Sequence, residues 1–283
     1  MLQKLPDNRK KIDMTFINFI ENKLPILNVL WKKVVEEIQK NGLWDQWMEP
    51  KPELKRVRDF LYILEHGEQH SRSFNLNEPC PQGLPCFPDL KNQPIHEVKN
   101  YPWTKILSEN FITIKNEVLN IQSNEYIDFD FDNHMTMMSA FPLFDKGEEI
   151  LKNTQKLPET VNVLRQIPRL CDTLPSANIL ISKMPSGTHL PRHCSIDNFR
   201  LRLMLGIVTP EDCFINVCNY QYHWKVGEIF LWEDSFEHEV RNKSQDHRII
   251  LVLDTWHPDL TDIETKILHK VSTYLFKLVA QAK

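Results

Sequence analysis

The segment RLRLMLGIV, residues 200–208, is the longest of five short apolar runs that decide the fold class. The others are ILISKM (179–184), FINV (214–217), EIFLW (228–232) and RIILVLDT (248–255). All five are rich in Ile, Val, Leu and Phe, and turn residues separate them. Short strands at such spacing are typical of an all-β sandwich or barrel. We therefore expect the second half of the chain to be mainly β.

Helical periodicity dominates the first seventy residues. Apolar side chains recur every three or four positions in two runs, namely Leu27, Trp31, Val34 and Ile38 before Gly42, and Leu54, Val57, Leu61 and Leu64 after Pro52. From Phe74 to Tyr101 the chain is rich in Pro, Asn and Asp, which predicts an extended connector. We expect a helical N-terminal region over residues 1–73 and a second domain over 74–283, in which helices support the strands.

Two further helices are expected in the second domain. One extends from Trp103 to Ile121, and the other ends the chain. The terminal helix begins near Thr261 and Glu264, whose spacing is that of a capping box. Its predicted buried stripe consists of Ile263, Ile267, Val271 and Leu275.

Composition and charge exclude several classes of protein. The chain has 283 residues and a formal net charge of −4, so a broad basic surface for nucleic acid is not expected. The best apolar stretch, Thr15 to Val35, contains Glu21 and Lys23, and charges are costly within a bilayer. We predict no stable membrane anchor and, without a convincing signal peptide, a cytoplasmic location. The six cysteines are expected to be free thiols. Nothing in the sequence indicates an oligomeric state.

Two histidines and one arginine stand out among the predicted strands. His193 and His238 lie far apart in the sequence, but a jelly-roll barrel can bring an early and a late strand to the same end. Two imidazoles suit Fe(II), Zn or Cu, and an inward Arg248 on the last strand suggests an anionic ligand. Ser195 occupies the position where sites with two histidines and one carboxylate usually carry their acid. Taken alone, two separated histidines in a β domain are more often structural.

Four longer strings resemble one known family. MPSGTHLPRH, NFRLRLMLGI, HWKVGEIFLWEDSFEHEV and LDTWHPDLT are together similar to the aspartyl/asparaginyl β-hydroxylase family, over roughly Phe87 to Glu264. This family consists of Fe(II)- and 2-oxoglutarate-dependent oxygenases. The resemblance implies a double-stranded β-helix, the jelly-roll and cupin-like fold, with flanking helices and a C-terminal helix. It also implies Fe(II), 2-oxoglutarate and O2 as cofactor and cosubstrates.

The same resemblance implies an iron site built by two histidines. His193 and His238 would be the metal ligands and catalytic residues. The family is an exception to the usual rule, because it places no carboxylate two residues after the first histidine. Ser195, where a Gly is more usual, therefore does not argue against activity. Asp234 matches an acidic residue before the second ligand, and we expect it to hold an iron-bound water by hydrogen bonding.

Further residues are implied for the cosubstrate and the substrate. In the 2-oxoglutarate pocket, Ser182 and Arg248 would bind the distal carboxylate, and Met184 would line the wall. Arg202 would bind a carboxylate near the iron. Met204 stands where the family has a histidine, which removes one hydrogen bond to the cosubstrate. Arg200, together with Arg202, favours a substrate that carries a carboxylate. We interpret four other residues as structural, namely His189, Cys194, Asp197 and His257.

The resulting hypothesis is a hydroxylase that acts on an unactivated C–H bond. Its expected substrate is a peptidyl or free amino acid of the Asp or Asn type, with succinate and CO2 as co-products. Three alternatives stay open: a lipid acyl-chain hydroxylase of the same family, a halogenase that uses the open coordination position, and a non-catalytic metal-binding module whose N-terminal helices bind a partner.

Overall fold

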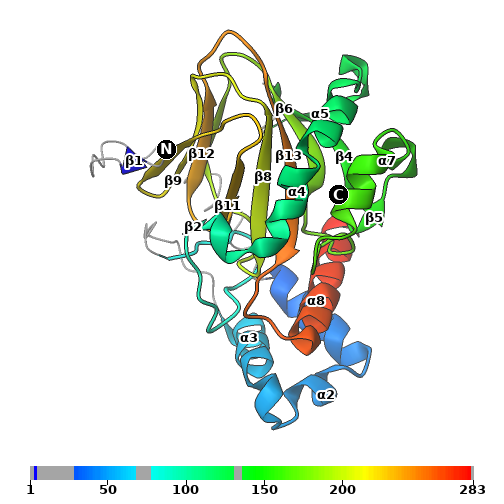
Figure 1. Ribbon diagram of the computed structural model, residues 1–283. Coiled ribbons are helices and arrows are strands. Elements are labelled where there is room, and N and C mark those ends of the chain that lie inside the picture. Colours follow the sequence, from blue (N-terminus) through cyan, green and yellow to red (C-terminus); the bar gives the residue numbers. More distant parts are fainter. Residues whose placement is uncertain (1–2, 5–28, 68–77, 131–135, 282–283) are drawn as a thin grey trace.

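A jelly roll of eight strands forms the centre of the molecule. The computed structural model describes residues 3–4, 29–67, 78–130 and 136–281. Strands β6 to β13 are distributed over two antiparallel sheets (Figure 1), and the chain changes sheet after every strand except between β9 and β10. Their bounds are Ile179–Met184, His189–His193, Arg200–Val208, Cys213–Val217, Tyr220–His223, Ile229–Trp232, His238–Asn242 and Arg248–Trp256.

The strand order confirms the predicted fold. One sheet contains β11-β8-β13-β6, and the other contains β10-β9-β12-β7. Consecutive strands therefore cross repeatedly from one sheet to the other, which is the double-stranded β-helix arrangement. The five predicted strands begin and end within one residue of their predicted bounds. β7, β10 and β12 were not predicted, because they are short and carry many polar residues.

Additional strands widen both sheets. The first sheet continues through β4 and β3 at one edge and through β2 at the other, while β5 pairs with β4. The second sheet gains β1 at its edge. The bounds of these strands are Gln3–Lys4 for β1, Ile95–His96 for β2, Ile127–Asp130 for β3, Thr136–Asp145 for β4 and Glu148–Glu149 for β5.

Side-chain alternation along β8 separates two cores. Leu201, Leu203 and Leu205 belong to a core on the outer face of the first sheet. That face is covered by helices α4 (Lys105–Glu109), α5 (Phe111–Leu119) and α7 (Pro158–Leu164), with α6 (Leu151–Thr154) beside β4. Met204 belongs instead to the core between the two sheets. Because successive side chains of a strand point to opposite faces, Arg200 and Arg202 share the inner side with Met204.

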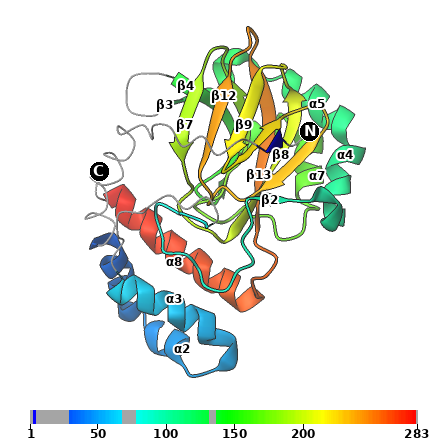
Figure 2. The ribbon, with the colours of Figure 1, turned by 90° about the vertical axis from the view of Figure 1, so that its left-hand side faces the viewer.

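A layer of helices packs below the two sheets (Figure 2). It consists of the helical residues 29–40, α2 (Trp44–Met48), α3 (Lys55–His66) and the C-terminal α8 (Asp262–Gln281). These helices share one hydrophobic core with Leu84, Phe87 and Phe199 from the connector and from the start of β8. The N-terminal helices thus pack directly against the end of the jelly roll.

Most helix predictions are confirmed, and two need correction. Thr261 and Glu264 form the predicted capping box, since each side chain bonds the backbone amide of the other. Ile263 is 40% exposed and lies outside the buried stripe, which is a correction. The segment from Trp103 to Ile121 contains two helices rather than one, because the chain breaks at Asn110 between α4 and α5. Of the first predicted stripe, Leu27 lies outside the described residues.

The prediction of six free cysteines is wrong. Cys80, in the connector, forms a disulfide with Cys194, which directly follows the end of β7. The two residues are 114 positions apart, so their pairing depends on how the connector folds back. The other four cysteines lie outside this disulfide, namely Cys86, Cys171, Cys213 and Cys218. Among the helices within the described ranges, none has the length and apolar character needed to cross a membrane.

Candidate active site

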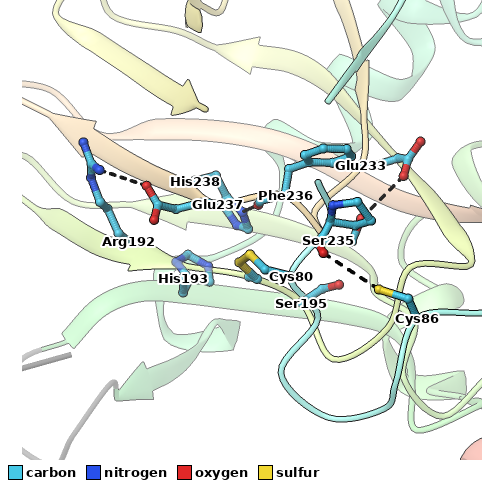
Figure 3. The surroundings of a disulfide bond; sticks show 12 residues. Cys80, Cys86, Arg192, His193, Ser195, Glu233, Ser235, Phe236, Glu237 and His238 are labelled. Atoms are coloured by element: carbon cyan, nitrogen blue, oxygen red, sulfur yellow. Dashed lines mark hydrogen bonds and ion pairs between the residues drawn. A yellow bond between two sulfur atoms is a disulfide. The ribbon is translucent and has the colours of Figure 1, made fainter. Parts of the chain in front are cut away.

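The two predicted metal ligands lie side by side. His193 ends β7 and His238 begins β12, and the two residues are direct cross-strand partners. Their ring centroids are 4.1 Å apart (Figure 3). The register shifts immediately beyond this pair, so that Val240 faces Leu190. Bulges of this kind re-aim side chains next to active sites.

Backbone carbonyl groups fix the tautomer of both imidazoles. The Nδ1 atom of His193 lies 2.7 Å from the carbonyl oxygen of Pro191, and that of His238 lies 2.8 Å from the carbonyl oxygen of Phe236. A carbonyl oxygen only accepts, so each Nδ1 carries the proton and donates it. Each Nε2 therefore holds the lone pair that binds a metal, and outer hydrogen bonds of this type orient histidine ligands in metalloproteins.

Burial keeps both imidazoles neutral. It lowers the pKa of His193, although the bond to Pro191 and the charge of Asp234 oppose the change. Burial also lowers the pKa of His238 well below its ordinary value, and the neighbouring His193 lowers it further. Neutral imidazole is the form that binds a divalent metal.

Two histidine side chains stand at this site, and among the described residues no third candidate ligand joins them. Within the described part of the chain, no group of three or more His, Cys, Asp or Glu side chains is placed to hold a metal ion. Ser195 donates its hydroxyl to the carbonyl oxygen of Asp197 and is turned to its own loop. The donor set thus fits a divalent iron whose remaining positions are left for small-molecule ligands.

A buried guanidinium without an acidic partner lies between the sheets. Arg248 is 2% exposed, and its Nη2 donates to the hydroxyl of Ser182 at 2.9 Å. Its Nε and Nη1 atoms are buried and have no hydrogen-bond partner among the residues that the structure describes. Burial lowers the pKa of Arg248 to about 10. A buried charge with unused donors fits an anionic ligand such as a carboxylate.

Aromatic rings connect this guanidinium with the histidine pair. Arg248 lies over the ring of Trp224 at 4.8 Å, and Trp224 contacts Tyr222. The series continues through Phe230 to Trp232, whose ring meets that of His238 edge-on at 4.6 Å. The indole N–H groups of Trp224 and Trp232 are also buried without a partner. Sequence reasoning missed both tryptophans, since a buried aromatic stripe looks like ordinary core.

Two methionines take part in this inner core, namely Met184, which was predicted to line the pocket, and Met204, which stands where the family has a histidine. Met184 is buried and pairs with Arg248 across β6 and β13. Met204 is buried as well, and it faces Phe230 on one neighbouring strand and Val252 on the other. Both methionines belong to the core between the sheets, together with Trp224 and Trp232.

A buried ionic cluster holds Asp234. Arg202 donates through Nη1 to Asp234 at 2.8 Å and through Nε and Nη2 to Asp254 at 2.8 and 2.9 Å. Burial disfavours the ionised form of Asp254, but Arg202 and Arg200 outweigh it and lower the pKa. Asp254 is the cross-strand partner of Arg202. Sequence reasoning missed Asp254, because its position opposite Arg202 depends on the β8–β13 register.

Arg200, which the sequence predicted to bind substrate, is engaged in internal ion pairs with Asp197 and Asp254. Arg200 is 2% exposed, and its guanidinium donates to Asp197 at 2.8 Å and to Asp254. Its charge is thus matched inside the protein, and it ties the loop after His193 to β13. Asp197 is the acidic partner in this ion pair, in agreement with its interpretation as structural.

The connector is anchored by another buried acid, Glu233. Glu233 accepts hydrogen bonds from the side chain of Asn92 at 2.6 Å and from the amide of Gln93 at 2.9 Å. Its other neighbours are His96, at 2.9 Å, and His257, at 3.7 Å. His257 is therefore held within the fold by Glu233. His189, the last of the four residues interpreted as structural, pairs with Glu239 at 2.8 Å on the partly exposed side of β7.

Comparisons with known proteins identify relatives that are hydroxylases. A family model described as aspartyl/asparaginyl beta-hydroxylase matches residues 108–258. The human aspartyl/asparaginyl beta-hydroxylase is 36% identical over 124 residues, which cover 44% of this chain and 16% of that protein. An ornithine lipid ester-linked acyl 2-hydroxylase from Rhizobium tropici is 26% identical over 184 residues, which cover 61% of this chain and 63% of that protein.

Solved structures include an oxidoreductase of the 2OG-Fe(II) oxygenase family from Burkholderia pseudomallei. Its TM-score is 0.39 at 10% identity, over 52% of this chain and 79% of that chain. The chain spans less than two thirds of the length of the human and Rhizobium proteins. The family match, in contrast, covers more than half of this chain and includes both histidines and Arg248. The chain therefore belongs to the aspartyl/asparaginyl beta-hydroxylase family.

Proposed function

We propose that the protein is an Fe(II)- and 2-oxoglutarate-dependent dioxygenase that hydroxylates a C–H bond. The observation that carries the proposal is the combination of two neutral, cross-strand imidazoles with a buried guanidinium that has no acidic partner in the described part of the chain. When bound, iron and 2-oxoglutarate supply the oxidising chemistry that inserts oxygen into the substrate, with succinate and CO2 as co-products.

The histidine pair would hold the iron. His193 and His238 present Nε2 atoms from neighbouring strands, and their Nδ1 bonds prevent either ring from turning over. Pre-orientation of this kind lowers the entropic cost of assembling the metal site. Asp234, held in place by Arg202, would accept a hydrogen bond from a metal-bound water in the position where other oxygenases use a carboxylate ligand.

Arg248 and Ser182 would bind the distal carboxylate of 2-oxoglutarate. Two unused guanidinium donors and a hydroxyl suit a bidentate contact with a carboxylate. Met184 and Met204 would provide the apolar wall beside it. Because the site is buried, the charge-assisted bonds gain strength from the low local dielectric.

The substrate is proposed as a peptidyl or free amino acid of the Asp or Asn type. This preference now rests on family membership and on the human relative, since Arg200 is committed to internal ion pairs. A lipid acyl chain is the second candidate, because the Rhizobium relative, whose name specifies an acyl 2-hydroxylase, matches a larger share of this chain. The cytoplasmic location stays a prediction.

A turnover assay with two substrate panels tests the proposal. Purified protein is loaded anaerobically with Fe(II), mixed with 2-oxoglutarate and ascorbate, and exposed to O2. Succinate is measured together with mass spectra of the acceptors, one panel of peptides and amino acids and one of acyl lipids. We expect succinate and a product that has gained one oxygen atom, and His238→Ala should give neither. Failure of the metal-loaded protein to bind 2-oxoglutarate would contradict the proposal.

A further inference from the structure

Cys80 connects the two loops that carry the histidine pair. Its sulfur is bonded to Cys194, the residue directly after His193. Its backbone amide donates to the carbonyl oxygen of Ser235, three residues before His238, at 2.7 Å. One residue of the connector thus holds both ligand-bearing loops, one by a covalent bond and the other by a hydrogen bond (Figure 3).

Backbone contacts continue from this point along the connector. The amide of Gln82 donates to the carbonyl oxygen of Ser195, and the amide of Leu84 donates to that of Ile196, both at 2.7 Å. The loops also meet directly, because the amide of Ser195 donates to the carbonyl oxygen of Asp234 at 2.7 Å. The disulfide is the covalent member of a set of contacts that otherwise consists of hydrogen bonds.

We propose that the Cys80–Cys194 disulfide is a positioning element of the metal site. It fixes the backbone after His193 relative to the loop before His238, and thereby holds the two imidazoles at the separation needed to bind one ion. This inference rests on the proposed function, because it concerns the affinity of the same histidine pair for a metal. Cys80 and Cys194 are positioning residues, since their sulfur atoms need not contact the metal.

Loss of the disulfide removes the covalent contact between the connector and the loop after His193. The bond joins residues that are 114 positions apart, and the entropy of closing so long a segment acts mainly on the unfolded state. The effect on the metal site comes from the local contact itself. Reduction by a dithiol breaks the S–S bond and adds two electrons and two protons, which yields two thiols and the disulfide of the reductant. The loop after His193 is then held by hydrogen bonds alone, which open more readily.

Metal affinity should consequently depend on the redox state. Disulfides persist in oxidising compartments and are reduced in the cytosol. In the cytoplasm predicted from the sequence, reducing thiols would open this disulfide and weaken the site. An oxidising environment would close the disulfide and strengthen metal binding.

Mn(II) binding, measured anaerobically by electron paramagnetic resonance, tests the proposal. The samples are oxidised protein, protein reduced with a phosphine, Cys80→Ser, and Cys86→Ser as a matched control, since Cys86 lies in the same connector but outside the disulfide. We expect the Kd for Mn(II) to rise roughly tenfold in the reduced protein and in Cys80→Ser. Cys86→Ser should bind as the oxidised protein does, and the phosphine should not weaken Cys80→Ser further.

Thiol counts and folding controls accompany the titration. Denatured oxidised protein should show four reactive thiols, and reduced protein should show all six. Circular dichroism reports whether Cys80→Ser folds. If it does not fold, the Kd for Mn(II) of the oxidised protein is compared with that of the reduced wild-type protein and of Cys194→Ser. The change in Kd separates positioning from a purely structural role, because general stabilisation would raise the melting temperature and leave Mn(II) affinity in the folded protein unchanged.

Three outcomes are distinguishable. Equal Mn(II) affinity in the oxidised, reduced and Cys80→Ser proteins overturns the positioning role and leaves the metal site standing. Six reactive thiols in the oxidised protein also overturn it, because the disulfide then does not form. An oxidised protein with four reactive thiols that binds no Mn(II) contradicts the proposed function itself.

Discussion

Replacing Arg248 by methionine should stabilise the ligand-free protein and strongly weaken binding of 2-oxoglutarate. The guanidinium is buried, donates one hydrogen bond to Ser182, and leaves two nitrogen atoms without a partner. No acid within the described ranges neutralises it, so its charge destabilises the folded state when no anion is bound. Methionine keeps much of the apolar stem and removes the charge, which makes the variant a direct test of this reasoning.

The magnitude follows from the pKa of the group. A pKa lowered from 12.5 to about 10 means that folding disfavours the charged form by about 3 kcal/mol. Removing the charge should therefore raise the free energy of unfolding by about 2–3 kcal/mol, which corresponds to roughly 5–10 °C in melting temperature. Loss of the charge-assisted contacts should weaken 2-oxoglutarate binding by about 3 kcal/mol, which is about 100-fold in Kd.

Two measurements on the same samples check this prediction. Thermal unfolding of the metal-free protein gives the change in stability, and calorimetric titration of 2-oxoglutarate into Mn(II)-loaded protein gives the Kd. Added 2-oxoglutarate should raise the melting temperature of the Mn(II)-loaded wild-type protein and leave that of Arg248→Met unchanged. Arg200→Met is the matched control, because it removes an equally buried guanidinium that has acidic partners.

A clear result would refute the reasoning. If Arg248→Met lowered the stability of the metal-free protein as much as Arg200→Met does, the charge of Arg248 would have to be satisfied inside the fold. The argument for an anion site at this position would then fail. Unchanged affinity for 2-oxoglutarate would contradict the assignment of Arg248 directly.

Three further predictions concern neighbouring groups. Arg200→Met should lower the free energy of unfolding by about 3–5 kcal/mol, because it leaves buried carboxylates uncompensated; urea unfolding measures this, and a loss below about 1 kcal/mol would show that the ion pairs matter little. Trp224→Phe keeps the ring under Arg248 but removes the unpartnered N–H, so we expect roughly tenfold weaker binding of 2-oxoglutarate with unchanged Mn(II) affinity, both measured by titration. Burial lowers the pKa values of His193 and His238 in the folded protein below their unfolded value near 6.5. The resulting contribution to the free energy of unfolding is fully present above that value and is lost as the pH falls through the folded pKa values. Thermal unfolding of the metal-free protein between pH 8 and about 5 should show this loss, and replacing both histidines by Gln should flatten the dependence.

Much of the fold was predictable because its signals are local. The apolar runs at residues 200–208 and 248–255 have the length and spacing of jelly-roll strands, and both form strands near those bounds. The capping box at Thr261 is equally local. Ile263 was assigned wrongly because periodicity does not say how far the covering layer reaches, and this residue lies at the exposed start of α8.

The site was less predictable, because its chemistry depends on strand register. Alternation places Arg200 and Arg202 on the inner side of β8, but only the pairing with β13 brings Asp254 opposite Arg202. Without that register Arg200 appears available to a substrate, whereas it is paired inside the protein. The Cys80–Cys194 disulfide was missed for a similar reason, since it needs the connector to return to the end of β7.

Anomalous X-ray diffraction from a crystal grown anaerobically with Fe(II) and 2-oxoglutarate tests the central claim most directly. We predict one iron peak, bonded to the Nε2 atoms of both His193 and His238, with the distal carboxylate of 2-oxoglutarate paired to Arg248. An iron peak elsewhere, or one that is bonded to a single histidine, would contradict the account.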